Sequence, residues 1–363
     1  MQPAVALRSR IPLTPFQIAQ IVIGIAFTIY LVYRFYVVLV VQRTYGPDTW
    51  LRLAISGLVL GAVYGLIAIG YTLVYGILFM INFAHGDIMM VGCFGGYFVF
   101  EALRAIHAPG GSFLDVYPIP SVLLAFAGGM GVAAVGGYFL EKIAYRPLRN
   151  APRLVPLISA IGASIFLENA AQLLFGSQPR DYSNPAVLTR GTGWNLYVGG
   201  TAVVVTYTGV FTFVLSILML IGLYLLVQHT RLGRAMRAVA ENKPVASLMG
   251  IDVDSVISQT FIISGALAGA AGVMWGVHLG LVYYYVGFVP GIKAFTAAVL
   301  GGIGNVPGAM LGGVFLGVVE ALGPPILGWS FQLADVIAFA ILVLVLVFRP
   351  TGLLGEVLTE AKV

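Results

Sequence analysis

Long apolar runs separated by short polar loops dominate the chain. A helix needs about 20 mostly apolar residues to cross the hydrocarbon core of a bilayer. The pattern therefore predicts an all-α, polytopic membrane helix bundle. The predicted spans are 17–41, 53–79, 87–104, 120–140, 155–175, 203–227, 257–282 and 331–348.

A further apolar segment, 294–322, is interrupted by glycines and by Pro307. Because proline lacks a donor and glycine weakens a helix, we expect two half-length helices joined by an irregular turn. In lipid, such a turn must be buried in protein or line a wet cavity. The polar turn 82–87 interrupts an apolar stretch in the same way, as in transporters built from repeats, although unrelated kinks would look alike. Four residues of the later turn are candidates for the translocation pathway: Gly301, Gly302, Gly304 and Asn305.

Composition supports a membrane protein and argues against several other classes. The 363 residues are 60% hydrophobic and 9% charged, whereas soluble domains are about 25% charged. A single cysteine, Cys93, leaves no internal disulfide and no cysteine-based metal site. The chain has no phosphate-binding glycine loop and no zinc-protease or nucleophile-elbow motif. We therefore expect neither an enzyme nor a bound cofactor or metal, and no ATP site in this chain.

Positive charge predicts the orientation, because lysine and arginine favour the cytoplasmic side. Both termini are then cytoplasmic, provided that 53–104 and 294–322 each leave and return to the outer face. The span 17–41 is too long for a cleavable signal peptide, so we expect an added anchor helix. We do not interpret the net charge of +5 as nucleic-acid binding. The charges in question are Arg8, Arg10, Lys142, Arg146, Arg149, Arg153, Arg231, Arg234, Arg237, Lys243, Arg349 and Lys362.

The loop 231–254 is the most informative one. Its first part has apolar residues at helical spacing opposite a basic face, and Pro244 is expected to begin a second short helix. Gly250 is a plausible left-handed stop, and Asp252 or Asp254 can cap the next span. This pattern fits an interfacial helix lying on lipid headgroups, with no core of its own, or a plug for a groove in a cytoplasmic partner. The residues assigned to this loop are Arg234, Arg237, Glu241, Asn242, Pro244, Leu248 and Gly250.

Ionisable groups inside a membrane are costly and suggest function. Asn82, His85 and Asp87 lie at a helix break, where they could line the pathway or cap the next helix. Glu168 is expected to hydrogen-bond a neighbouring helix or a partner.

Three other charged residues lie near predicted helix ends. Glu320 and Asp335 are expected to be solvated, and Lys293 to cap a helix or meet a partner.

Five motifs follow one another along the chain, at 65–76, 81–87, 144–149, 157–164 and 293–304. Together they resemble the branched-chain amino acid permease family of ABC importers, in its LivH-type form. The resemblance covers about residues 51 to 356, which we take as the permease domain. Residues 1–50 depart from the short family form and would add a helix and linker, and 357–363 would be a cytoplasmic tail.

The resemblance implies a set of partners and a location. A LivM-type permease would pair with this chain, two cytoplasmic ATPases would dock beneath the pair, and a periplasmic binding protein would deliver substrate. The complex would lie in the bacterial inner membrane. Residues 241–250 of this chain would be the ATPase-coupling loop. An importer of urea or short amides and a stand-alone channel or carrier are the alternatives.

Overall fold

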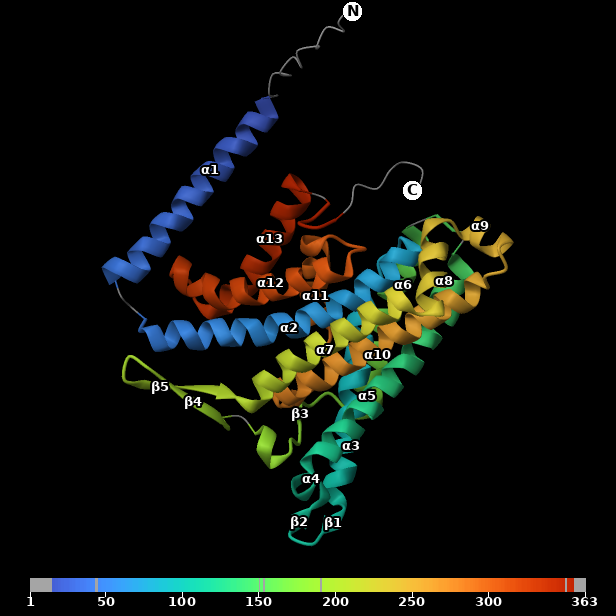
Figure 1. The fold of residues 1–363 in the computed structure, drawn as a ribbon, viewed down its shortest axis with the longest axis horizontal. Coiled ribbons are helices and arrows are strands. Elements are labelled where there is room, and N and C mark those ends of the chain that lie inside the picture. The colour runs from blue at the N-terminus through green and yellow to red at the C-terminus, as the bar shows by residue number, and fades with distance from the viewer. Residues whose placement is uncertain are drawn as a thin grey trace, which may run out of the picture.

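The chain folds into a bundle of long helices, which we describe from a computed structural model (Figure 1). The structure describes residues 15–42, 45–149, 151, 152, 154–189, 191–349 and 351–355. The tail 357–363 and the charges Arg8, Arg10, Arg153 and Lys362 lie outside these residues. The α-helices are α1 (Pro15–Tyr36), α2 (Pro47–Leu78), α3 (His85–Ala105), α4 (Phe113–Val116), α5 (Pro118–Leu140), α6 (Leu154–Phe175), α7 (Tyr207–His229), α8 (Arg231–Glu241), α9 (Lys243–Leu248), α10 (Val253–Leu279), α11 (Phe288–Gly301), α12 (Val306–Leu327) and α13 (Ala334–Phe348).

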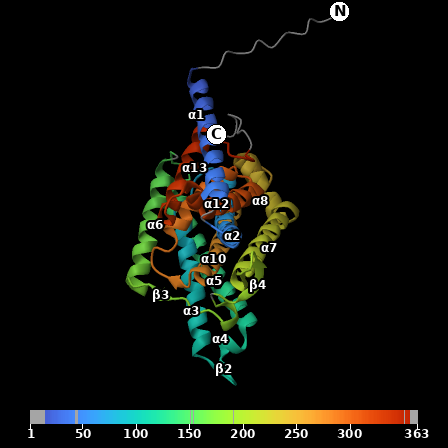
Figure 2. The same cartoon turned by 90° about the vertical axis from the view of Figure 1, so that its left-hand side faces the viewer.

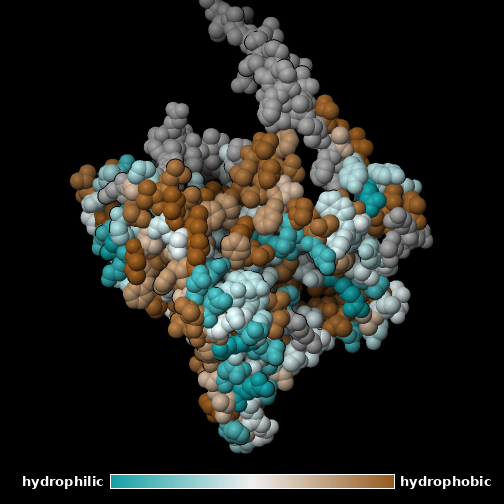
Figure 3. Space-filling view, turned by 180° about the vertical axis from the view of Figure 1, so that it is seen from behind, coloured by the Kyte–Doolittle hydropathy of each residue, from teal (hydrophilic) through white to brown (hydrophobic). Residues whose placement is uncertain are grey.

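The predicted all-α membrane class is confirmed. Among the described residues, eight helices are long and apolar enough to cross a membrane. In Figure 3 hydrophobic side chains cover most of the upper part of that face, and hydrophilic ones gather at the lower tip, near β1 (His107–Ala108) and β2 (Gly111–Ser112). The boundaries of two predicted spans were wrong. In the span 203–227, residues 203–206 belong to strand β5 (Thr201–Thr206), which pairs with β4 (Gly193–Val198). Residues 281 and 282 form β6 (Leu281–Val282), which pairs with β3 (Arg180–Asp181).

Glycine seams hold the core helices together. In α2, a methyl group at Gly61 would lie 2.7 Å from the Val314 Cα of α12. In α10, a methyl group at Gly269 would lie 2.5 Å from the Gly129 carbonyl oxygen of α5. Without a hydrophobic driving force between helices in lipid, close backbone packing of this kind supplies much of the association. Helices α6 and α7 flank the bundle on opposite sides (Figure 2).

Two helical hairpins, α2–α3 and α11–α12, leave one end of the bundle and return to it. The predicted out-and-back path of 53–104 and 294–322 is therefore observed, whereas the membrane face from which these segments start stays a prediction. Only half of the expectation for 294–322 holds, because α11 has 14 residues whereas α12 has 22 and is of full length. Pro307 lies in the first turn of α12, where a missing donor costs nothing, so it starts this helix instead of shortening it.

Both hairpin turns lie at the end of the bundle that carries α8 and α9 (Figure 1). Phe79 and Gly304 line one cavity with Arg237 there. Arg149 binds Asp254 at the same end. We call this the basic end, and the opposite end, with β1 to β6, the outer end.

The added N-terminal helix α1 meets the bundle near the outer end. Arg34 donates a hydrogen bond of 2.8 Å to the Leu327 carbonyl oxygen, at the C-terminus of α12. The unpaired carbonyls of a helix C-terminus favour a cation. Helix α1 continues as a π-helix, η1 (Val37–Gln42). The predicted span 17–41 thus has a helical counterpart.

Candidate functional site

Local capping shapes the loop at the basic end. The Thr230 hydroxyl accepts from the Gly233 amide at 3.0 Å and begins α8, and Asn242 accepts from Val245 at 3.0 Å and begins α9. Pro244 lies in the first turn of α9, as predicted. Gly250 has φ 81°, a left-handed conformation that favours glycine, and ends the loop. The predicted Asp252 cap is also present, with 3.1 Å to the Ser255 amide.

Helix α8 does have a core to pack against, contrary to the expectation for its apolar face. Met236 and Val239 are buried where α8 contacts α7, α2 and α10. Arg237 donates to the Val227 and Gln228 carbonyl oxygens, at 3.4 Å for the second, and so caps the C-terminus of α7. Arg234 and Glu241 are exposed. The basic face therefore contributes to the fold as well as to the surface.

The exposed apolar residues lie instead on and just after α9. Leu248 is 87% exposed, Met249 78% and Val245 52%. We call these three residues the α9 tip. Ala246 of the same helix is buried, and its carbonyl oxygen accepts from the Ile251 amide at 3.1 Å. The tip is thus held on an anchored helix, pointing away from the bundle.

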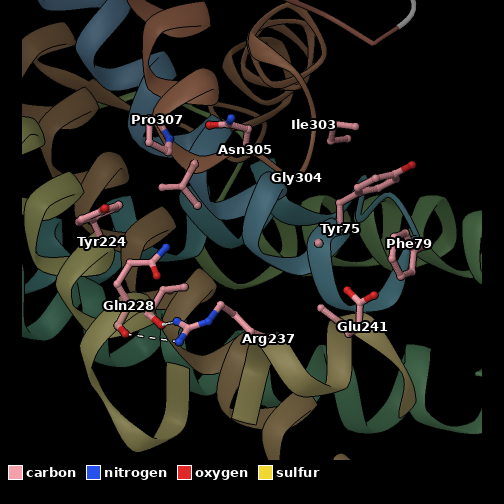
Figure 4. Close-up of a pocket in the computed structure, with 14 residues that line it drawn as sticks. Tyr75, Phe79, Tyr224, Gln228, Arg237, Glu241, Ile303, Gly304, Asn305 and Pro307 are labelled. Carbon is pink, nitrogen blue, oxygen red and sulfur yellow. Dashed lines mark hydrogen bonds between the residues drawn. The ribbon is translucent and has the colours of Figure 1, made fainter. Parts of the chain in front are cut away.

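A cavity of about 490 Å³ lies between this loop and the two hairpin turns. We call it the inner cavity. Figure 4 shows Arg237 and Glu241 on one side of it, with Asn305 and Pro307 across from them. Asn305 accepts from the Gly308 amide and donates to the Leu354 carbonyl oxygen, both at 2.9 Å, so it caps α12. The cavity is lined by Tyr75, Gly76, Phe79, Tyr224, Val227, Gln228, Arg237, Ala240, Glu241, Ile303, Gly304, Asn305, Val306 and Pro307.

The structure thus brings part of the predicted loop and part of the predicted pathway together. Gly304 lines the inner cavity, whereas Gly301 and Gly302 lie outside its lining and pack against backbone. Gly302 has φ 102°, and a side chain there would collide with the backbone of Gly355. These two glycines therefore shape the turn that borders the cavity.

The polar residues of the α2–α3 turn lie inside the bundle, away from the inner cavity. Asn82 accepts from the Tyr145 hydroxyl at 3.0 Å. His85 has its Nδ1 3.5 Å from the Ser264 hydroxyl of α10. Asp87 is buried in the first turn of α3, close enough to Glu168 of α6 for the two charges to interact. Glu168 therefore lies near a neighbouring helix of this chain, but one of its carboxylate oxygens is buried without a hydrogen-bond partner among the described residues, so the predicted hydrogen bond is not seen at that oxygen.

One ionic cluster in the membrane was missed. The Lys293 ammonium lies 2.7 Å from Glu320 and 2.6 Å from Asp335, and 3.4 Å from the Tyr64 hydroxyl. Lys293 and most of Glu320 are buried, so the expectation of solvation was wrong for Glu320. Asp335 is half-exposed, and so only partly solvated. Three ionisable residues in otherwise apolar helices were the signal, since burial demands pairing.

A second ionic cluster lies at the basic end. Glu141 is fully buried, with Arg146, Arg149 and Ser258 around its carboxylate. Arg149 also binds Asp254. Burial, and then the positive charge of Arg149, lower the pKa of Lys243, the first residue of α9, below its usual value. The cluster thus extends to the loop 231–254.

Comparison with known proteins agrees with the motifs. The family model described as "Branched-chain amino acid transport system / permease component" matches residues 53–346. The chain is 47% identical over 310 residues to the high-affinity branched-chain amino acid transport system permease protein BraD of Pseudomonas aeruginosa, covering 85% of this chain and 96% of BraD. It is 43% identical over 307 residues to the corresponding protein LivH of Escherichia coli K12, with the same two coverages. No solved structure matches the chain significantly.

Proposed function

The chain belongs to the family of branched-chain amino acid permeases, and we propose that it is the membrane-spanning subunit of an ATP-binding cassette importer for these amino acids. The chain is a multi-pass membrane protein and a transport subunit. In this proposal it has no enzymatic activity of its own. ATP is hydrolysed by separate subunits. The names of the similar proteins BraD and LivH describe branched-chain amino acid transport, which favours this substrate class over urea or short amides.

The α9 tip carries the proposal for ATPase docking. An apolar tip of three exposed side chains on an anchored helix matches the shape of a plug for a groove in another protein. The alternative was an amphipathic helix lying on headgroups, which needs a long free apolar face. In this chain α8 buries that face against the bundle, and α9 has only six residues. Docking is the better explanation.

We place the inner mouth of the translocation pathway at the inner cavity. Its volume of about 490 Å³ lies in the range of about 300–1,000 Å³ that small-molecule sites occupy. Arg237 and Glu241 come from α8, within the loop 231–254, and Gly304 and Asn305 come from the α11–α12 turn. Movement of the loop by an ATPase would therefore change the cavity directly. Asn82, His85 and Asp87 would act deeper in the pathway.

The remaining partners follow from this role. A LivM-type permease would pair with the chain, two ATPases would dock at the basic end, and a periplasmic binding protein would meet the outer end. The basic end and both termini would face the cytoplasm of a bacterium, across its inner membrane. Residues 51–356 would form the transport domain, with 1–50 as an added anchor and 357–363 as a tail.

The double substitution Leu248→Asp and Met249→Asp tests the proposal. Both side chains are exposed, so the fold should be retained while charge replaces the apolar tip. We expect the ATPases to be lost on purification of the complex, and leucine uptake into vesicles to fall to background. Arg231→Ala, on the exposed side of α8, is the matched control. Normal ATPase binding and uptake in the double variant would contradict docking, and leucine transport by the purified chain alone would support a stand-alone carrier.

A further inference from the structure

An ionic cluster links the N-terminal part of α10 to the segment between α5 and α6. The Glu141 carboxylate accepts from Arg149, from the Arg146 Nε at 3.3 Å and from the Ser258 hydroxyl at 2.8 Å. Because a buried carboxylate is costly unless its oxygens are paired, these three donors hold it in one arrangement. Ser258 belongs to α10, whereas the other groups belong to the segment after α5, so the cluster joins two elements.

Arg149 extends this cluster to the coupling loop. Its second terminal nitrogen donates to Asp254, in the first turn of α10. Only five residues separate Asp254 from Leu248, the last residue of α9, in the chain. Lys243, at the start of α9, lies close enough to Arg149 to be repelled by it. Arg149 itself is largely buried, with 13% of its side chain exposed. A displacement of α9 therefore acts on Arg149 at two places.

The middle of the same segment contacts the α2–α3 turn. Tyr145 is fully buried, and its hydroxyl donates to the Asn82 Oδ1 at 3.0 Å and to the Ile81 carbonyl oxygen at 3.4 Å. Its ring also packs against Phe261 of α10, at 5.2 Å between centroids. Between Glu141 and Leu148 the backbone is π-helical and then 3-10 helical. Such irregular turns often mark hinges and functional sites.

We infer that residues 141–149 form a relay that carries movement of the coupling helix α9 to the α2–α3 turn, with Arg149 and Tyr145 as its two positioning residues. The inference rests on the proposed function, because it assumes that an ATPase moves α9. The physical basis is a short path through the structure: the chain joins α9 to Asp254, Asp254 pairs with Arg149, and Tyr145 of the same segment donates to Asn82. Since the buried groups have fixed partners, the segment would move as one body that is attached to α10 at its two ends and to the α2–α3 turn at Tyr145.

The test measures coupling in the full importer, reconstituted with its ATPases and binding protein. We compare Arg149→Ala, Asp254→Asn and Tyr145→Phe by leucine taken up per ATP hydrolysed. Each variant should keep its ATPases and its rate of hydrolysis, while the uptake-to-hydrolysis ratio falls by about tenfold, as expected for loss of coupling between sites. Lys142→Ala is the matched control, because it removes a positive charge from the same turn but contacts only Tyr138 in the structure described.

Asp254→Asn keeps the inference testable if Arg149→Ala does not fold. The Asp254 side chain is 61% exposed, so the amide leaves no buried charge. The pair Arg149→Ala and Tyr145→Phe should be no worse than either single variant, because steps in series are not additive. Unchanged ratios in all three single variants, or additive losses in the pair, would overturn the relay. Failure of the unmodified complex to use ATP for uptake would instead overturn the proposed function.

Discussion

The buried cluster of Lys293, Glu320 and Asp335 allows a quantitative prediction for Lys293→Met. At 2.7 Å between Lys293 and Glu320, two unit charges attract by about 6 kcal/mol at an effective dielectric constant of about 20. Desolvation offsets part of this attraction in the folded state. Removing one partner of a buried pair usually costs about 3–5 kcal/mol, because the other charge stays buried and unpaired. We expect a loss of this size for Lys293→Met.

Substitutions at Asp335 and Glu320 show whether the loss of stability comes from the broken ion pair or from removal of the side chain itself. Asp335 is half-exposed, so Asp335→Asn should change the free energy of unfolding by about 1 kcal/mol or less. The double variant Lys293→Met and Glu320→Gln should recover much of the loss, because no unpaired carboxylate then remains on α12. Denaturant unfolding in detergent micelles gives the free energy of unfolding of the unmodified protein, of the two single variants and of the double variant. Equal losses for Lys293→Met and Asp335→Asn, or no recovery in the double variant, would refute the reasoning.

Three further predictions concern packing and capping. Gly61→Ala should destabilise the protein by about 1–3 kcal/mol, because its Cβ would meet the α12 backbone. Gly76→Ala should have no such effect, because the space around Gly76 is free. Thermal unfolding distinguishes the two variants, and equal losses of stability would contradict the glycine seam. Asn242→Ala should cost about 1 kcal/mol of local stability in α9, seen as faster amide exchange there, and Asn242→Ser should restore protection if the cap is responsible. Arg34→Met should lower the unfolding temperature by about 2 °C through loss of its bond to the Leu327 carbonyl oxygen, and an equal effect of Arg34→Lys would argue against the hydrogen bond as the cause.

Local signals explain what the sequence could predict. Runs of about 20 apolar residues define the spans, because only a helix satisfies its own backbone in lipid. Pro244, Gly250 and Asp252 act within their own turns, so the start of α9, its stop and the cap of α10 were predictable. The strand 203–206 was not, because a valine-rich stretch becomes a strand only through pairing with β4.

Contacts between distant residues explain what was missed. Glu320 lies 27 residues from Lys293 in the chain, and Asp254 lies 105 from Arg149. No local pattern joins them, although burial of each charge makes a partner necessary. The packing of α8 was hidden for the same reason, since an apolar face does not indicate what covers it. The inner cavity is lined by three segments that lie far apart in the chain, 75–79, 224–241 and 303–307, so no local pattern reveals it.

The shortness of α11 has a consequence for the backbone that precedes it. Its 14 residues make a helix about 21 Å long, against about 30 Å of hydrocarbon. Its C-terminal end leads into the turn that lines the inner cavity, and residues 283–287, just before its N-terminal end, are not helical. With the inner cavity at one membrane surface, these non-helical residues would lie within the thickness of the hydrocarbon layer. Their backbone groups would then have to be paired inside the protein, shielded from lipid by the surrounding helices.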